Sequence, residues 1–214
     1  MVGYEPFYDG GGYLSLTETD PPQSFVEPLT LAQVKSFLKL PPRVPANPDE
    51  DEELESLIRS ARAVAELHQG RDLVRKQWDM TFDSFCGHVI LSREPLVSVD
   101  LVQYRDSAGA LTVVLPADYI VDAAKGRGVL LPGSVGWPSF TAWPSSAILV
   151  RYTSGFAADS VFWKDEGEPI KHGMRKLIAD SFINKLPFER SYDPAKDTFG
   201  VASLLSHGGK RILG

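Results

Sequence analysis

The sequence has a single cysteine, Cys86, among its 214 residues. One thiol cannot form an intramolecular disulfide, and it cannot build a cysteine-based zinc site. The first twelve residues also carry neither the basic nor the apolar region of a signal peptide. A chain without disulfides or such a peptide fits a reducing compartment, so we expect synthesis in a cytoplasm.

Basic charge and long hydrophobic runs are also scarce. Lys and Arg number 22 against 28 Asp and Glu, which gives a net charge of −6. Proteins that grip nucleic acid need clustered positive charge, so we expect no specific DNA binding. A mildly acidic protein surface that DNA slides past without specific binding is compatible with this charge. No stretch approaches 18 uninterrupted apolar residues, so we expect no membrane span.

No group of residues has the spacing of a catalytic centre. His88 lies two residues from Cys86, but a nucleophilic thiol also needs a base oriented by a third group, and none is nearby. His172 and Asp180 are eight residues apart on one predicted helix, too far for a dyad. His68 is interpreted as a core or interface residue. No glycine-rich phosphate loop or His-Glu-x-x-His motif occurs. We expect no enzyme, no metal and no cofactor.

Two amphipathic helices are predicted in the first third of the chain. Thr30 and Gln33 have the spacing of a capping box, and Pro41 follows the first helix and should stop it. An acidic run at 49–55 begins the second helix, with Asp49 as a plausible cap, and Gly70 should end it. The carboxylates lie at the positive end of that helix dipole, so we interpret them as a helix start and not as a metal site.

From about residue 76 to 153 the hydrophobic period changes from helical to alternating. Three runs around Trp78, Val99 and Val150 alternate, and Gly- and Pro-containing turns separate them. The turn at 106–109 predicts a hairpin. This region is therefore expected to hold five to seven short strands in an antiparallel sheet or sandwich.

A third helix is predicted from Pro169, at its first position, to Pro187. The fold class is α+β, a small helical bundle of three main helices with an inserted antiparallel β domain and extended N- and C-terminal arms. The expected organisation is an N-terminal arm at 1–28, a helical core from 29–75 and 156–190, a β domain at 76–155 and a C-terminal arm at 191–214.

A series of motifs follows these segments between residues 29 and 213, together with the third helix. The motifs are Leu29-Thr30-Leu31-Ala32-Gln33-Val34-Lys35-Ser36-Phe37-Leu38, the acidic Asp49–Glu53 leading into Leu54, Leu57, Ile58, Ala61 and Arg62, then Trp78, Glu94-Pro95-Leu96-x-Ser98-Val99, Val150-Arg151-Tyr152-Thr153-Ser154-Gly155-Phe156 and Val201-Ala202-Ser203-Leu204-Leu205. In this order they resemble the head–tail connector (adaptor) family of tailed bacteriophages, gene-transfer agents and prophages, whose structural proteins are made in the host cytoplasm.

The resemblance implies a structural role at the head–tail junction (neck) of a virion. Members of the family form a ring, usually of twelve subunits, beneath the portal protein. The ring extends the channel for double-stranded DNA and gives the stopper or tail completion proteins a platform. By this resemblance the partners are the chain itself, the portal and the stopper or tail completion protein, with no membrane.

The arms are the expected partner-binding segments, because aromatic and apolar residues gather there without a core of their own. The tryptophans that bracket a loop at 137–143 give an alternative, a virion-associated carbohydrate- or receptor-binding β module, against the interpretation that they pin the loop to the sheet or to a neighbour. The residues singled out are Tyr4, Phe7, Tyr8 and Tyr13 in the first arm, Leu204, Leu205, Lys210, Arg211, Ile212 and Leu213 in the second, and Trp137 and Trp143. The end of the second arm is assigned to the portal.

Overall fold

The structure is a computed structural model that describes residues 15–19, 26–42, 47–85, 87–124, 126–184 and 204–205. It divides into two compact units, and the chain passes between them more than once. The β unit contains the described part of Met1–Phe25 together with Arg75–Gly155. The helical unit contains Val26–Val74 and the described part of Phe156–Gly214. Each unit has its own hydrophobic core, so each is considered by itself.

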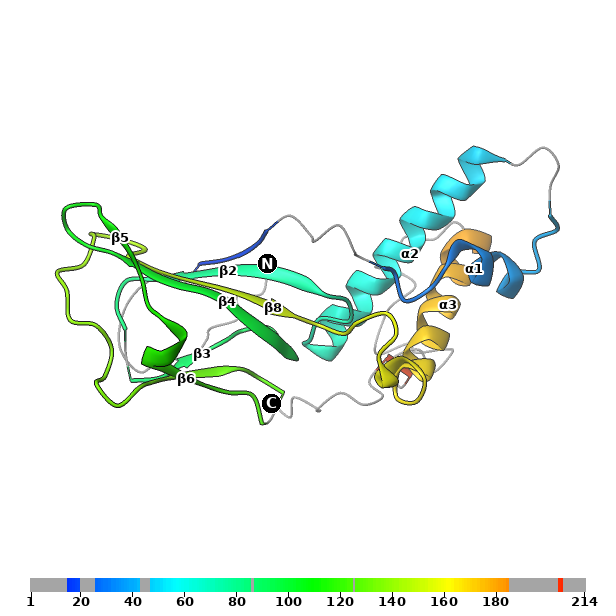
Figure 1. The fold of residues 1–214 in the computed structure, drawn as a ribbon. Coiled ribbons are helices and arrows are strands. Elements are labelled where there is room, and N and C mark those ends of the chain that lie inside the picture. The colour runs from blue at the N-terminus through cyan, green and yellow to red at the C-terminus, as the bar shows by residue number, and fades with distance from the viewer. Residues whose placement is uncertain are drawn as a thin grey trace. The chain divides into compact units, whose positions relative to one another are not determined.

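The helical unit holds three α-helices and one short 3-10 helix among the described residues (Figure 1). Apolar side chains at helical spacing give these helices a common buried face. The core includes Leu54, Ile58, Ala61 and Ala65 from the second helix. The elements are α1 (Leu31–Phe37), α2 (Pro48–Gln69), η2 (Val161–Trp163) and α3 (Gly167–Asn184).

The predicted start of the first helix is confirmed. The Thr30 side chain accepts a hydrogen bond from the Gln33 peptide N–H, and the Gln33 side chain accepts one from the Thr30 peptide N–H. Leu29 and Val34 are both buried in the helical core. The predicted stop was late, because α1 ends at Phe37, before a left-handed residue at Lys39 with φ of 55°.

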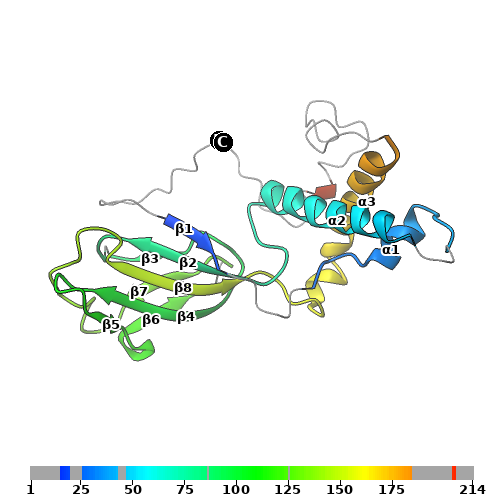
Figure 2. The same cartoon turned by 90° about the horizontal axis from the view of Figure 1, so that it is seen from above.

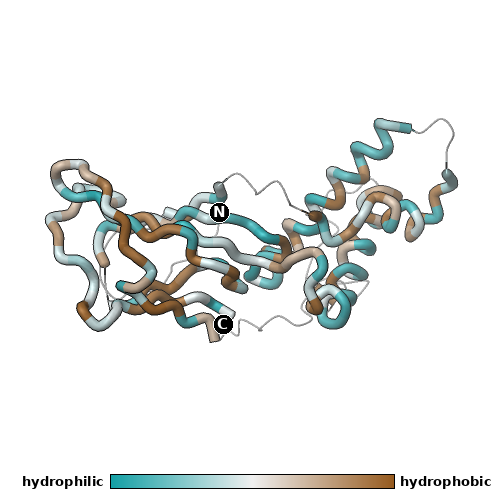
Figure 3. Tube along the Cα trace, in the orientation of Figure 1, coloured by the Kyte–Doolittle hydropathy of each residue, from teal (hydrophilic) through white to brown (hydrophobic). Residues whose placement is uncertain are grey.

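Two other helix ends differ from the prediction. Asn47 occupies the cap position of α2, so Asp49 lies within the first turn, where its charge still faces the positive end of the helix dipole. The acidic start of α2 is hydrophilic in Figure 3. α3 begins at Gly167, which moves Pro169 from the first helical position to the third. Gly70 ends α2 in the left-handed conformation, with φ of 67°, as predicted.

The β unit is a sandwich of two antiparallel sheets (Figure 2). The five-stranded sheet has the order β1-β2-β8-β4-β5 and the three-stranded sheet the order β3-β7-β6. Alternating side chains of both sheets fill one core, which includes Trp78, Met80, Leu130 and Tyr152. The strands are β1 (Ser15–Glu18), β2 (Lys76–Phe82), β3 (Val89–Ile90), β4 (Leu96–Arg105), β5 (Leu111–Val113), β6 (Tyr119–Asp122), β7 (Val129–Pro132) and β8 (Ile148–Ser154), with the 3-10 helix η1 (Pro116–Asp118) between β5 and β6.

The predicted hairpin at 106–109 joins β4 to β5. Asp106 stabilises it, because one of its carboxylate oxygens accepts hydrogen bonds from the peptide N–H groups of Ala108 and Ala110, each at 2.9 Å. Gly109 takes the positive φ of 86° that this turn needs. The sequence did not predict β1, which lies inside the segment interpreted as the first arm and pairs with β2.

Candidate functional site

The C-terminal residues Leu204 and Leu205 lie against the helical unit. Leu205 is completely buried in the core of that unit, and Leu204 is half-buried. The side-chain amide of Gln69, at the end of α2, donates a hydrogen bond to the Leu205 carbonyl oxygen. Leu205 therefore contacts its own chain, an arrangement that the hypothesis of partner binding did not include.

A glycine of α3 makes room for this contact. A Cβ atom on Gly173 would lie 2.9 Å from Leu205 Cδ2 and 3.3 Å from Leu204 Cβ. The absence of a side chain at this position thus creates the notch that Leu205 fills. An isolated glycine within a helical pattern is a signal of such close approach, but the sequence analysis did not use it.

Buried charges connect three segments of the helical unit. Arg62 on α2 donates hydrogen bonds to Glu27 at 3.0 Å and to Glu66 at 2.8 Å. The second carboxylate oxygen of Glu66 accepts a hydrogen bond of 3.1 Å from the Leu73 peptide N–H. Burial raises the pKa of Glu27, and this effect outweighs the lowering of its pKa by Arg62. The network fixes the segment before α1 and the loop after α2 to the same helix.

The β unit presents a polar outer face on its five-stranded sheet. Arg151 on β8 forms two hydrogen bonds of 2.7 Å with the carboxylate of Asp79 on β2. Asp100 on β4 accepts hydrogen bonds from Gln77, Ser98 and Thr153, with distances between 2.7 and 3.1 Å. The face therefore carries one bidentate ion pair and one carboxylate held by neutral donors.

The two tryptophans of the loop between β7 and β8 have different environments. Trp137 is half-buried, stacks on Phe85 with a centroid distance of 4.4 Å, and donates an Nε1 hydrogen bond of 2.9 Å to the Gly87 carbonyl. Trp143 is exposed beside the β4–β5 hairpin, with the Arg105 guanidinium 5.6 Å from its ring centroid. The rings therefore do not form a matched pair of exposed faces. The other singled-out residues, Tyr4, Phe7, Tyr8, Tyr13, Lys210, Arg211, Ile212 and Leu213, lie outside the described residues.

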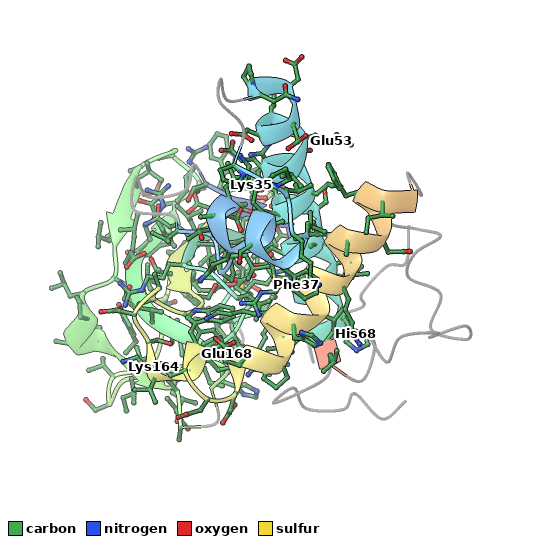
Figure 4. All side chains as sticks on the ribbon, turned by 90° about the vertical axis from the view of Figure 1, so that its right-hand side faces the viewer. Lys35, Phe37, Glu53, His68, Lys164 and Glu168 are labelled. Carbon is green, nitrogen blue, oxygen red and sulfur yellow. The ribbon has the colours of Figure 1, made fainter. Side chains whose placement is uncertain are left out.

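Two of the histidines lie in the helical unit, His68 on α2 and His172 on α3. His172 on α3 makes an edge contact with the Phe37 ring, at a centroid distance of 6.1 Å. His68 lies near the C-terminal end of α2 and Glu53 near its N-terminal end (Figure 4). Among the residues that the structure describes, no three His, Cys, Asp or Glu side chains gather as metal ligands would. None of the described helices combines the length and apolar character that a membrane span requires.

The chain is similar in fold to chains of known structure. No family model matches the sequence, and no curated protein is significantly similar to it. A chain from the neck of an empty gene transfer agent (GTA) particle, computed with C6 symmetry, is 20% identical, with a TM-score of 0.69 over 90% of this chain and 93% of that one. A chain from the virion of a native GTA particle is 21% identical, with a TM-score of 0.66 over 93% and 97%.

A chain from the neck of a native GTA particle, computed with C12 symmetry, is 20% identical, with a TM-score of 0.64 over 90% and 93% of the two chains. The likeness covers nearly the whole of each chain, so it includes both units. The protein therefore shares the fold of chains from the neck and virion of GTA particles.

Proposed function

We propose that this protein is a structural subunit of the neck of a phage-like particle, a head–tail adaptor. The observation that carries the proposal is the fold likeness to a GTA neck chain, which covers 90% of this chain and 93% of the other. A match over both units is more informative than a match to one, because helical bundles and β-sandwiches each occur in many unrelated proteins. The ordered sequence segments between residues 29 and 213 independently favour the same family.

In this role the chain forms a closed homo-oligomeric ring below the portal protein. The C6 and C12 symmetries of the similar necks support a cyclic arrangement, and we propose twelve copies. Cyclic rings larger than dimers need two different surfaces on each subunit, one for each neighbour. The ring would extend the DNA channel and provide a platform for the stopper or tail completion proteins. Its net charge of −6 suits a channel that DNA passes without specific binding.

The C-terminal tip is the proposed contact with the portal. Lys210 and Arg211 beside Ile212 and Leu213 combine positive charge with apolar surface. Because Leu205 is buried in the helical core, the tip begins from a point fixed on that unit. The nine residues 206–214 would then reach the partner from a defined place.

Two measurements test the role. Gold labelling of the tagged protein in intact particles should give signal at the junction of head and tail. A purified portal ring should also retain the full-length protein in a pull-down assay. Label at the tail tip would favour the carbohydrate- or receptor-binding alternative, for which only Trp143 offers an exposed aromatic ring of the two tryptophans. Absence of the protein from the particle would contradict both roles.

A further inference from the structure

One side of the β unit carries an apolar edge. The edge strand β5 of one sheet leads through Leu115 and η1 into β6, the edge strand of the other sheet. Both strands lie on the same side of the sandwich in Figure 2, and the run through β5 is apolar in Figure 3. Five aliphatic side chains here are between 43% and 60% exposed, and Asp118 is the only charged residue in the segment 111–121. They are Leu111, Val113, Leu115, Ile120 and Val121. We call these five residues the apolar edge.

Exposed aliphatic side chains at a sheet edge favour contact with another segment or chain. Among the residues that the structure describes, β5 pairs only with β4, so its other side has backbone groups available for a further strand. Soluble proteins usually protect edge strands with charges or prolines, but β5 itself reads Leu-Thr-Val. Leu111 and Val113 face outward from the five-stranded sheet and Ile120 faces outward from the three-stranded sheet, so exposed aliphatic residues flank this edge on both sides. Exposed aliphatic residues along edge strands mark a site of interaction.

The N-terminal segment joins the sheet at its opposite edge. β1 is the other edge strand, fixed by pairing of Ser15 with Thr81 and by a 2.8 Å hydrogen bond between their hydroxyls. Fourteen residues precede it, and they include four aromatic residues and only two charged side chains. We call residues 1–14 the aromatic arm. Fully extended, it would span roughly 45 Å.

The sheet register places the point where the aromatic arm joins β1 in the same row as a residue of β5. Ser15 pairs with Thr81, Thr81 with Leu149, Leu149 with Gln103, and Gln103 with Val113. The arm leaves β1 at this row. In a head-to-tail ring whose subunits meet by their β edges, it would therefore emerge beside the β5 strand of the next copy.

We propose that the aromatic arm of one copy covers the apolar edge of the neighbouring copy, a contact that rests on the proposed ring. The β5 strand of the same chain is a less suitable site for the arm. To reach it, the arm would cross the outer face of its own sheet, which is about 20 Å wide, along the row of Thr81, Leu149 and Gln103 and beside the Arg151–Asp79 pair. Leu149 is the one apolar residue of these three, so aromatic side chains gain little apolar contact there. The neighbour's edge offers aliphatic surface and free strand-pairing positions at the correct height.

Crosslinking of the full-length protein tests this contact. One copy carries Tyr4→Cys, Phe7→Cys or Tyr8→Cys, and a differently tagged copy carries Val113→Cys, both with Cys86→Ser to remove the native thiol. A short bismaleimide should link the two tags. Val135→Cys, an exposed position in the turn after β7, is the matched control and should give no link. Leu111→Lys with Ile120→Lys should abolish the link, whereas Val135→Lys should not.

The outcomes separate the arm contact from the ring. Light scattering of the wild-type protein and of the copies that carry Cys86→Ser establishes whether they assemble and whether the replacement is tolerated. Assembly without a link between the tags overturns the proposed contact and leaves the ring intact. A link formed only when both cysteines are in one chain also overturns it, because the arm then covers its own edge. Linked tags support the contact, and the protein's absence from the head–tail junction would count against the neck function alone.

Discussion

At the scale of single residues, Gly173 sets two opposing effects against each other. Alanine there favours the helix by about 1 kcal/mol over glycine, but its Cβ would lie 2.9 Å from Leu205 Cδ2. We expect Gly173→Ala to loosen the C-terminal segment and to give no gain in the free energy of unfolding. In a Leu205→Ala background the close contact is relieved, so the same substitution should stabilise by up to about 1 kcal/mol.

Urea denaturation of the four proteins in this double-mutant cycle measures the coupling. Limited proteolysis of the C-terminal segment gives a second measure, and it should be faster in both single variants than in the wild type. Equal effects of Gly173→Ala in the two backgrounds would contradict the notch as described. Leu205→Met, which nearly conserves volume, is the control that should retain the contact.

Glu27 gives the helical unit an unusual dependence on pH. Its pKa is raised in the folded state because burial disfavours the charged carboxylate more than Arg62 favours it. The folded protein therefore binds more protons than the unfolded chain between the ordinary pKa of 4.5 and the raised folded pKa. Glu27 thus contributes more stability below this window, and that contribution is lost as the pH rises through the folded pKa.

Glu27→Gln removes this titration. The wild type should lose stability relative to Glu27→Gln as the pH is raised through the window, measured by urea denaturation at several pH values. The comparison isolates Glu27 because other carboxylates titrate equally in both proteins. A constant difference across the window would contradict the raised pKa. The reverse trend would mean that the Arg62 pairing outweighs burial.

At the scale of elements, α1 is a helix of only seven residues, so its ends matter. The capping box at Thr30 and Gln33 satisfies backbone N–H groups that such a short helix leaves unpaired. Thr30→Ala should destabilise the protein by about 1 kcal/mol, whereas Thr30→Ser should keep most of the cap. Ser36→Ala, an exposed position in the same helix, is the matched control and should be neutral or slightly stabilising. Urea midpoints would distinguish these outcomes, and equal midpoints for Thr30→Ala and Ser36→Ala would contradict the cap.

The elements with strong local signals were predictable from the sequence. The capping box at Thr30, the α2 stripe with its Gly70 end, and the Asp106–Gly109 hairpin each depend on residues a few positions apart, and the structure has all three. The α+β class followed from the change of hydrophobic period near residue 76.

Features that depend on distant partners were not predictable. β1 is four residues long and has no alternating run of its own, so only its pairing with Thr81 and Met80 makes it a strand. The burial of Glu66 depends on Arg62 and on the Leu73 peptide, and the notch at Gly173 depends on Leu205, 32 residues further along the chain. The apolar edge was missed for a related reason. Its aliphatic residues look like core in sequence, and only the strand order places them at an edge.

At the scale of the whole molecule, the C-terminal segment has two parts with different expected roles. Leu205 belongs to the core of the helical unit, and residues 206–214 carry the basic and apolar tip. Stability and portal attachment should therefore be separable by the length of a truncation. Burial of a leucine side chain stabilises a protein by about 1.5–3 kcal/mol, so the loss of Leu205 should lower the urea midpoint, and loss of the tip alone should not.

Two truncations test this separation. Deletion of 206–214 should leave the urea midpoint unchanged and abolish retention by a purified portal ring, because Lys210 and Arg211 are removed while the Leu205 contact stays. Deletion of 204–214 should lower the midpoint as well. Lys210→Ala with Arg211→Ala, in the full-length chain, should weaken retention. Retention of this variant should also depend less on salt concentration than retention of the wild type, because fewer charges take part. Retention of the protein that lacks 206–214 would assign portal binding to another surface. An unchanged midpoint after deletion of 204–214 would contradict the stabilising burial of Leu205 in the core.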